Sequence, residues 1–435
     1  PIRTALSGPA AGVIAGAHIA KSAGFANVIT CDMGGTSFDV SLVAGGESAL
    51  AAQTSIDFGL VVRTPMIEIT TIGAGGGSIA SVDRGGILQV GPESAGSDPG
   101  PACYGFGNER PTVTDANLVL GRINAARPLG GKLQRLDTEA ARRAVRRAIG
   151  EPLALDEVAA AEAIIRVANA RMAGAIRLVS VERGHNPRDF IAMPFGGGGA
   201  LHAGALIKEV GLAKALVPRF PGVTSALGCV IADMRHDFVQ TVNALLDDCD
   251  MAALDAALTR HAQDGLALLE RAGVAFVGRD CQFELDMSYV GQTHTVAVPL
   301  TLAFDGRRTD VSTALIRAAF AQRYRETYGR LLDGIPVRLM NLRVAVVGRR
   351  PKFDLALLAP AADATIEKAR RGERRVYVDG AWHAATVYER LELPAGARLP
   401  GPALLEQDDA TTFIEPDLAG EVDRFGNLII ARKEG

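Results

Sequence analysis

The sequence has 435 residues, of which 48% are hydrophobic and 22% charged, with a formal net charge of −3. That length suggests two or three domains, and that apolar fraction is enough for sizeable cores. Lysine and arginine are spread through the chain, which argues against a nucleic-acid-binding surface, and no apolar run approaches the ~20 residues that a membrane-spanning helix needs.

The start of the chain and its cysteines bear on its location. The first residues, PIRTALSGPAAG, lack the basic and apolar blocks of a signal peptide, so we expect a cytoplasmic protein. The sequence opens on Pro1 without Met and enters a stretch rich in glycine and proline, which suggests a fragment or a processed chain. An odd number of widely spaced cysteines argues against a disulfide framework: Cys31, Cys103, Cys229, Cys249 and Cys281.

The first predicted element is a hairpin over residues 27–43, NVITCDMGGTSFDVSLV, in which apolar and β-branched residues flank a glycine turn. Its backbone N–H groups can approach a phosphate, its hydroxyls can donate further hydrogen bonds, and a carboxylate at a strand end can hold the water shell of Mg²⁺. The alternative is an ordinary Gly-Gly hairpin tip. A second glycine cluster follows at 73–77, where the backbone must turn tightly or approach another group closely.

Residues 91–121 contain too many glycines and prolines for regular structure until about Thr114, where Asp115 is a candidate cap of a short helix. Residues 137–183 carry apolar side chains at helical spacing and predict two or three helices. A strand at 190–195 then leads through four glycines into a helix that ends near Val210. Such a turn can lie against an adenosine or donate to phosphate; the alternative is a tight strand-to-helix turn.

Beyond Asn243 the pattern changes to two helices, 251–272 and 313–328, with strands between them, and after residue 341 to short strands with Gly/Pro/Asp turns. We therefore expect an α/β fold in three domains. These are a lobe at 1–245, an α+β domain at 246–345 and a small β-rich C-terminal module at 346–435.

Several Cys, His and Asp side chains lie in glycine-rich segments, and such side chains form transition-metal sites where they converge. Their spacing in the sequence is too wide to establish convergence, and buried thiols and capped imidazoles are the alternative. The wider group is Asp98, Cys103, Asp115, His185, His202 and His236. The predicted metal ligands are Asp32, Asp98, Cys103, Asp115 and His202, with Zn²⁺ or Mn²⁺ as candidate ions beside Mg²⁺.

Several blocks of the sequence together resemble the hydantoinase A/oxoprolinase family, which also includes the nucleotide-binding subunits of acetone- and acetophenone-type carboxylases. The resemblance extends over essentially the whole chain, in family order. The blocks are CDMGGTSFDV, IGAGGGSIA, GSDPGPACYG, PTVTDANLVLGR, FGGGGALHA, PGVTSALGCVIADMRHDF and GPALLEQDDATTFIEP with VDRFGNL.

The resemblance implies an actin-like (ASKHA, ribonuclease H-like) lobe that binds ATP and Mg²⁺. DMGGTSFD resembles the phosphate hairpin of the second lobe, and FGGGGALHA the turn on the adenosine side. Asp32 is the candidate for positioning Mg²⁺, with Asp39 second, although both carboxylates could instead only cap or bridge their hairpin. The implied nucleotide-binding residues are Gly34, Gly35, Thr36, Ser37, Gly75, Gly76, Gly196, Gly197, Gly198 and Gly199.

Family members usually begin with another Asp-x-Gly-Gly-Thr hairpin in a preceding domain, which this chain lacks, so we expect that lobe to be truncated or on another polypeptide. The implied activity is ATP-dependent hydrolysis of a cyclic amide or imide (a hydantoin, 5-oxoproline or a lactam) by phosphorylation of the carbonyl oxygen. A second, B-type subunit would complete ring opening. Two alternatives are the nucleotide-binding subunit of an ATP-dependent ketone carboxylase and a non-catalytic structural subunit.

Overall fold

The computed structural model describes residues 7–51, 54–56, 60–62, 66–130 and 133–433. The chain divides into two compact units, one of Pro1–Val230 with Phe353–Gly435 and the other of Ile231–Lys352. Within the described ranges, no helix has the length and apolar character needed to cross a membrane.

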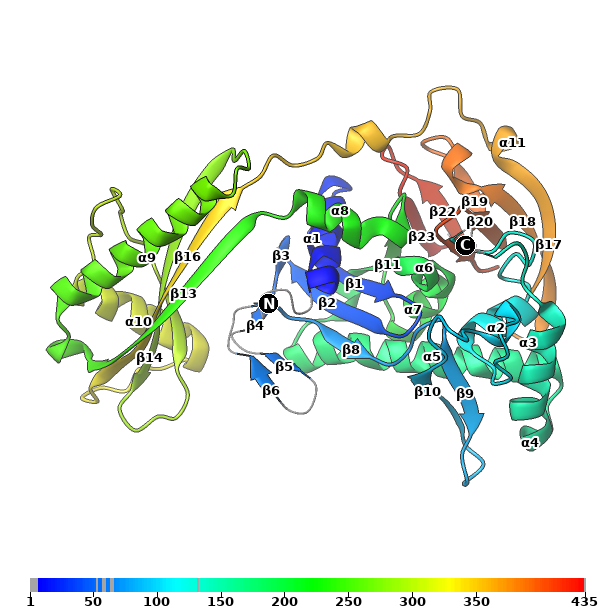
Figure 1. Cartoon of the computed structure of the whole chain (residues 1–435), viewed down its shortest axis with the longest axis horizontal. Helices are drawn as coiled ribbons and strands as arrows, with labels where there is room; N and C mark the ends of the chain where they lie inside the picture. Colours follow the sequence, from blue (N-terminus) through cyan, green and yellow to red (C-terminus); the bar gives the residue numbers. More distant parts are fainter. Residues whose placement is uncertain (1–6, 52–53, 57–59, 63–65, 131–132, 434–435) are drawn as a thin grey trace. The chain divides into compact units, whose positions relative to one another are not determined.

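A nine-stranded sheet forms the centre of the first unit (Figure 1). Its order is β19-β22-β23-β12-β11-β1-β2-β3, and β8 also pairs with β2. The strand β11 runs parallel to β1 and to β12, while the other pairs are antiparallel. The strands are β1 (Val28–Met33), β2 (Phe38–Ala44), β3 (Glu47–Ser48), β8 (Thr70–Ile72), β11 (Ile191–Phe195), β12 (Lys214–Val217), β19 (Arg398–Pro400), β22 (Leu418–Val422) and β23 (Leu428–Arg432).

The residues that the sequence assigned to a separate module, 346–435, are divided: β19, β22 and β23 belong to this sheet, whereas β17, β18, β20 and β21 form a sheet of their own within the same unit. Strand β23 pairs antiparallel with β12, in a register that sets Leu428 opposite Val217. The inserted unit begins and ends at Ile231 and Lys352, whereas the sequence placed boundaries at 245 and 345. Composition does not reveal such pairing, because the two partner strands are separated by the whole inserted unit.

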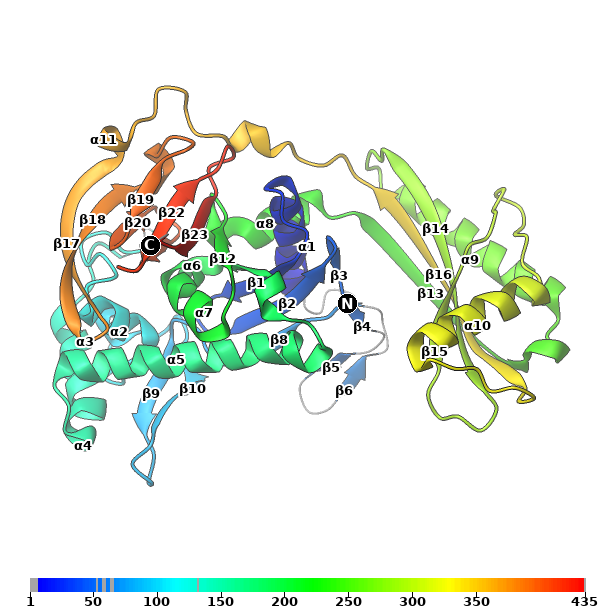
Figure 2. The same cartoon turned by 180° about the vertical axis from the view of Figure 1, so that it is seen from behind.

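Helices cover both faces of the large sheet (Figures 1 and 2). Because side chains alternate along a strand, Ile29, Cys31 and Met33 of β1 join a core with helices α5 (Glu157–Val179) and α7 (Ala203–Val210). Val28 joins a second core with helix α1 (Ser7–Ser22) on the opposite face. Each face of the strand is thus buried against helices.

The remaining elements of the first unit surround this sheet. A four-stranded sheet has the order β17-β18-β20-β21, and β9 and β10 form a hairpin. The strands are β4 (Leu50–Ala51), β5 (Thr54–Ile56), β6 (Leu60–Val62), β7 (Met66–Ile67), β9 (Ser78–Val82), β10 (Leu88–Ser94), β17 (Arg370–Val378), β18 (Ala381–Glu389), β20 (Ala403–Glu406) and β21 (Thr411–Ile414). The helices are α2 (Val113–Val119), α3 (Thr138–Val145), α4 (Glu151–Leu153), α6 (Gly196–Gly199), α8 (Thr224–Ile231) and α11 (Ile366–Ala369).

The second unit is an antiparallel sheet of order β13-β16-β14-β15 with helices α9 and α10 packed against it. Its core includes Leu258, Phe320, Leu285 and Val346. The elements are β13 (Met234–Leu245), α9 (Met251–Arg271), β14 (Gly278–Tyr289), β15 (Val296–Leu300), α10 (Thr313–Tyr328) and β16 (Val337–Arg349).

The structure confirms those predicted elements whose sequences show a clear hairpin or helix pattern. The hairpin predicted at 27–43 is β1 and β2, and the helices predicted at 251–272 and 313–328 are α9 and α10. The glycine turn is different in detail, because Gly196–Gly199 already forms a short helical turn before α7.

Candidate functional site

The tip of the β1–β2 hairpin packs directly on the second glycine cluster. The N–H of Gly76 donates to the carbonyl oxygen of Gly34 at 3.0 Å, and that of Gly77 donates to Gly35 at 2.6 Å. A Cβ on Gly75 would lie 2.5 Å from backbone atoms of Gly35 and Thr36, so a side chain there would displace the tip. The two glycine-rich segments that the sequence singled out are one packed feature.

The third glycine turn meets the same hairpin at the end of β1. Gly196 has φ +77°, and a Cβ there would lie 2.4 Å from the carbonyl oxygen of Met33 and 2.5 Å from Oδ1 of Asp32. Gly198 and Gly199 also approach β1, since their Cβ atoms would lie 3.2 Å from the Met33 sulfur and 3.3 Å from the Cys31 carbonyl oxygen. Glycine is therefore required where α6 begins beside the strand.

A cavity of about 430 Å³ opens among these turns. It lies in the size range of small-molecule sites. Six of its lining glycines come from the three glycine segments, namely Gly34, Gly35, Gly76, Gly77, Gly197 and Gly198, and Gly96 and Gly130 line it as well. Much of the remaining wall is apolar, with Val113, Ile123, Leu129, Leu133, Leu136 and Leu201. Such a lining suits a ligand with one flat apolar part and one polar part.

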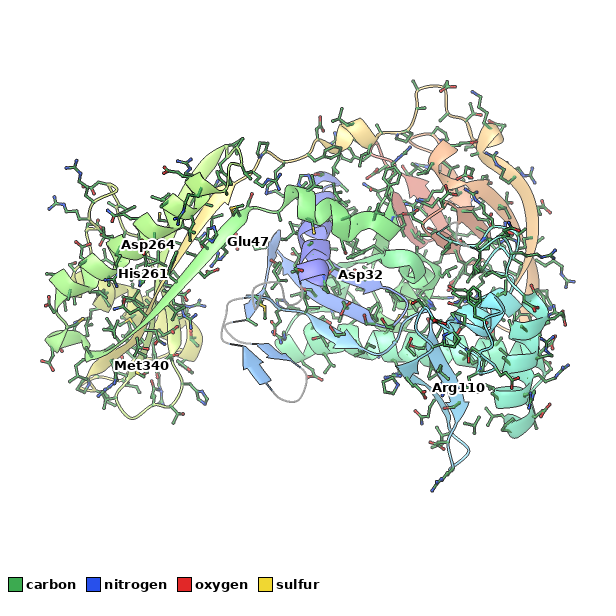
Figure 3. All side chains as sticks on the ribbon, in the orientation of Figure 1. Asp32, Glu47, Arg110, His261, Asp264 and Met340 are labelled. Atoms are coloured by element: carbon green, nitrogen blue, oxygen red, sulfur yellow. The ribbon has the colours of Figure 1, made fainter. Side chains whose placement is uncertain are left out.

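Two carboxylates stand opposite each other at the base of the hairpin tip. Asp32 on β1 and Asp39 on β2 are register partners (Figure 3 labels Asp32). Ser225 Oγ donates to Asp32 Oδ2 at 3.1 Å, Ser37 Oγ donates to Asp39 Oδ2 at 3.2 Å, and Thr71 Oγ1 donates to Asp39 Oδ1. Burial raises the pKa of Asp32 to about 6; the Ser225 hydrogen bond opposes this shift and the charge of Asp39 adds to it.

The carboxylate pair and the cavity lie on different sides of the hairpin. Asp32 alternates with Met33, which lines the cavity and packs in the α5/α7 core. Asp32 instead shares its face with Val28, which packs in the α1 core, and it accepts its hydrogen bond from helix α8. The glycine tip, on which Thr36 is exposed, therefore connects the two predicted groups of site residues: the carboxylates on one side of the hairpin and the cavity-lining glycines on the other.

The structure places Cys103 beside Asp115 but does not gather the predicted transition-metal ligands into one group. No group of three or more His, Cys, Asp and Glu side chains capable of holding a metal ion exists among the residues that the structure describes. Asp98 is exposed, and Cys103 is a buried thiol whose pKa is raised by burial and by the nearby Asp115 carboxylate. Of the wider group, His236 lies in the second unit and His185 stacks edge-on against Phe190.

Asp115 has a structural role that uses its acceptor capacity. Its carboxylate, which is fully buried, accepts from the N–H groups of Ala102, Cys103 and Thr112 and from the Thr112 hydroxyl, at 2.7–3.0 Å. Thr112 is the N-cap of α2 and Asp115 its third residue, so the pair forms a capping box. The prediction that Asp115 itself is the cap is corrected by three positions.

His202 lines the cavity and is almost completely buried. Its Nδ1 lies 2.6 Å from Oδ1 of Asn169, while its Nε2 has no hydrogen-bond partner. Burial, followed by the charge of Arg122, lowers the pKa of His202 to about 3, so the imidazole is neutral. The charge of the neighbouring Arg122 guanidinium also disfavours a cation at His202, where the metal assignment stays a prediction.

Three residues near the cavity and the carboxylates had not been selected from the sequence. They are Ser225, which binds Asp32; Asn117, which lines the cavity; and Asp409, which lines it and accepts from the Gly222 N–H at 2.8 Å. Each lies in a block that carries the family resemblance. A single Ser, Asn or Asp has no spacing signal, however, and its partners are distant in the sequence.

Comparisons with known proteins agree with this arrangement. Residues 1–238 match the family model described as hydantoinase/oxoprolinase, and residues 251–428 match the hydantoinase/oxoprolinase C-terminal domain. The chain belongs to the hydantoinase/oxoprolinase family, which confirms the resemblance inferred from the sequence.

Among its relatives, the chain is 37% identical to caprolactamase subunit alpha of Pseudomonas jessenii over 94% of this chain and 59% of that one. The crystal structure of ATP-dependent caprolactamase from P. jessenii superposes with TM-score 0.77 and 35% identity, covering 98% of this chain and 62% of that chain. Nucleotide-free acetone carboxylase gives TM-score 0.79 and 25% identity, with 98% and 61% covered. The chain thus spans about three-fifths of the length of these relatives.

Proposed function

We propose that this chain binds ATP and forms part of the phosphorylating apparatus of an enzyme that hydrolyses a cyclic amide or imide. The observation that carries the proposal is the convergence of three glycine-rich turns on one cavity, with the Asp32–Asp39 pair on the other side of the hairpin that helps to line it. Two relatives whose names state ATP dependence, the caprolactamase and the acetone carboxylase, support it. We further infer that the sheet with its phosphate-type hairpin is an actin-like lobe.

The hydrogen bonds at the tip suggest how phosphate would be held. The N–H groups of Gly34, Gly76 and Gly77 already donate within the site, so they shape the tip. We assign phosphate binding to the N–H groups and hydroxyl of the exposed Gly35 and Thr36, because backbone donors at a turn without side chains bind phosphate closely. The side-chain-free wall formed by the other glycine turn would lie against the nucleoside.

Paired carboxylates fit Mg²⁺ at the other side of the tip. Two adjacent negative charges repel each other, and a divalent cation with its water shell relieves that repulsion. Ser225, Ser37 and Thr71 hold the two carboxylates in place by hydrogen bonds. Bound ATP supplies a phosphoryl group, which turns the carbonyl oxygen of an amide into a leaving group. The residues of this chain would orient the phosphates and balance their charge.

A partner is also part of the proposal. The caprolactamase relative is named as a subunit, and this chain spans about three-fifths of its length. We propose that another domain or a second subunit supplies the rest of the site and completes ring opening. The acetone carboxylase structure favours a second candidate function, the nucleotide-binding subunit of a ketone carboxylase. A silent structural subunit is the third, and it differs from both in that it binds no nucleotide.

Isothermal titration of Mg-ATP into the purified chain, alone and with its co-purifying partner, tests the proposal. We expect binding that Asp32→Asn weakens about tenfold or more, while Asp264→Asn, at an exposed position in the second unit, leaves it unchanged (Figure 3). If neither preparation binds Mg-ATP, the proposed ATP-binding function is wrong and the structural-subunit hypothesis replaces it. Phosphate release with lactams, hydantoins or ketones then separates the two enzymatic functions.

A further inference from the structure

A second cavity, of about 410 Å³, adjoins the wall of the glycine-lined cavity. His202 lines the glycine-lined cavity, and Asn169, which is hydrogen-bonded to it, lines the second one. Among the described residues, none lines both cavities. Helices α5 and α7 and the end of β17 supply most of the wall of the second cavity. It lies in the size range of small-molecule sites and is separate from the proposed nucleotide site.

Most of the charged side chains that line the second cavity neutralise each other. Lys208 forms an ion pair with Glu415, and Arg166 forms one with Glu162 at 3.2 Å. Arg122 differs from these residues, because within the described part of the chain it has no ion pair although it is only 5% exposed. The cavity therefore contains one buried positive charge that no adjacent carboxylate balances.

The Arg122 guanidinium is also poorly supplied with hydrogen-bond acceptors. Its Nη2 donates to the carbonyl oxygen of Tyr377 at 3.3 Å. Its Nε is shielded and without a partner, while Nη1 retains accessible surface and makes no hydrogen bond to any described residue. The charges of Glu415, Glu162 and Asp379 act on it only from beyond ion-pair distance. A buried guanidinium with a free N–H edge favours an anionic ligand, such as a carboxylate, in the adjoining space.

Asn169 presents a second donor to the same cavity. It is only 6% exposed, and its Oδ1 is occupied by Nδ1 of His202 at 2.6 Å. The amide nitrogen makes no hydrogen bond within the described ranges, and an amide N–H can only donate. Asn169 and Arg122 both lie beside His202, the first by this hydrogen bond and the second by the effect of its charge on the imidazole. Both donors therefore belong to one end of the cavity.

The free carboxylates of this cavity lie at the protein surface. Glu209 is exposed and forms no ion pair with a described residue. The side chain of Asp379 is 72% exposed and lies 3.7 Å from Lys208, which Glu415 holds more closely. Apolar wall is added by Ile165, Ala205 and Val378. The cavity thus combines a buried positive end, an apolar wall and exposed negative groups.

We propose that this cavity binds an ω-amino acid, in which a methylene chain separates a carboxylate from an ammonium group. The carboxylate accepts from Arg122 and Asn169, the chain lies on the apolar wall, and the ammonium lies against Glu209 and Asp379. A spacer is needed because the positive end is buried while the free carboxylates are exposed. Addition of water to a lactam ring gives an ω-amino acid, so the ligand is a product of the proposed reaction, and this link rests on the proposed function.

Isothermal titration of 6-aminohexanoate into the whole chain, with its partner if that is required, tests the inference. Hexanoate and hexylamine are matched controls, because each keeps the chain and one of the two charges. We expect 6-aminohexanoate to bind about tenfold or more tightly than either, since each control lacks one charge-assisted contact. No binding of 6-aminohexanoate, or equal binding of all three compounds, would overturn the inference.

Two sets of variants locate the site. Arg122→Leu should remove the preference for 6-aminohexanoate over hexylamine. Because Arg122 is buried and its loss can impair folding, the double change Glu209→Gln with Asp379→Asn is the second test, at exposed positions. Asparagine also tolerates the positive φ of residue 379. The double change should bring the ratio of 6-aminohexanoate to hexanoate affinity towards one, while Asp264→Asn should leave it unchanged. An unaltered ratio in the double variant would overturn the site.

Parallel titration of Mg-ATP separates this inference from the proposed function. Binding of Mg-ATP without binding of 6-aminohexanoate would overturn the inference alone. Binding of 6-aminohexanoate without Mg-ATP would overturn the proposed function and support the amino-acid site, because the two cavities have no described lining residue in common.

Discussion

Asp32 and Asp39 face each other across strands β1 and β2, with both carboxylates on the side of the sheet opposite to the cavity that the hairpin tip helps to line. The tip that joins the two strands supplies Gly34 and Gly35 to the cavity wall, and a Cβ on Gly196 would lie 2.5 Å from Oδ1 of Asp32. Burial of Asp32 and the negative charge of Asp39 both disfavour the ionised form of the Asp32 carboxyl. The first two predictions below follow from this.

The pKa of Asp32, raised to about 6 from its ordinary 3.8, predicts a pH-dependent stability difference. Between pH 4 and 6 the folded state holds a proton that the unfolded state has lost, so the free energy of unfolding falls as the pH rises through this window. In Asp32→Asn this decrease should be absent, with a difference of about 3 kcal/mol at most. Denaturant unfolding of both chains at pH 4, 5, 6 and 7 measures it. Parallel pH profiles would contradict the prediction.

Ser225→Ala should move the pH dependence of Mg-ATP binding. The Ser225 hydroxyl stabilises the ionised form of Asp32, so its removal should raise the pKa of Asp32 further. Since the proposed Mg²⁺ site needs the carboxylate, affinity should decline at a higher pH than in the wild type. Titration at half-unit steps from pH 5 to 8 locates the midpoint. Ser312→Ala, the cap of α10 in the second unit, is the matched control and should keep the wild-type midpoint.

Gly75→Ala should destabilise the junction between the hairpin tip and the second glycine cluster. The new methyl group would lie 2.5 Å from the backbone of Gly35 and Thr36, so one segment must move. Overpacking of this kind costs about 1–3 kcal/mol, and thermal unfolding should show a lower Tm. Gly35→Ala is the control, because its Cβ would meet nothing within 4 Å. An equal effect of both changes would mean that chain flexibility, and not close approach, is the cause.

Asp115→Asn should reduce the free energy of unfolding by about 3–5 kcal/mol, since it leaves buried N–H and O–H donors facing an amide nitrogen. The exposed N-cap Asp137 of helix α3 provides the comparison. There Asp137→Asn should cost a few tenths of a kcal/mol, because asparagine caps about as well as aspartate. Denaturant titration measures both values. Equal losses would contradict the structural role assigned to Asp115.

The sequence predicted those features that depend on neighbouring residues. The β1–β2 hairpin follows from alternation around Gly34 and Gly35, and α10 follows from its regular apolar spacing. The T-x-x-D pattern at Thr112 and Asp115 also contained a capping box, of which only Asp115 was selected, as the cap itself.

Features that depend on distant residues could not be predicted. The bond between Ser225 and Asp32, the contact of Asn169 with His202 and the pairing of β23 with β12 all join segments far apart in the chain. The transition-metal hypothesis stays a prediction, and it too depends on residues far apart in the chain. Residue types suggested Cys103, Asp115 and His202 as ligands; the fold places the first two side by side and the third beside Asn169 and Arg122.

The pairing of β12 with β23 also limits the order in which the protein can form. During synthesis, β12 emerges well before β23, with the whole unit Ile231–Lys352 made between them. Until Leu428–Arg432 leaves the ribosome, β12 remains an unpaired edge, and unpaired edges attract other strands. The nascent chain therefore has to protect an aggregation-prone strand while the inserted unit folds, so its yield should depend on chaperones more than that of a protein whose sheet closes locally.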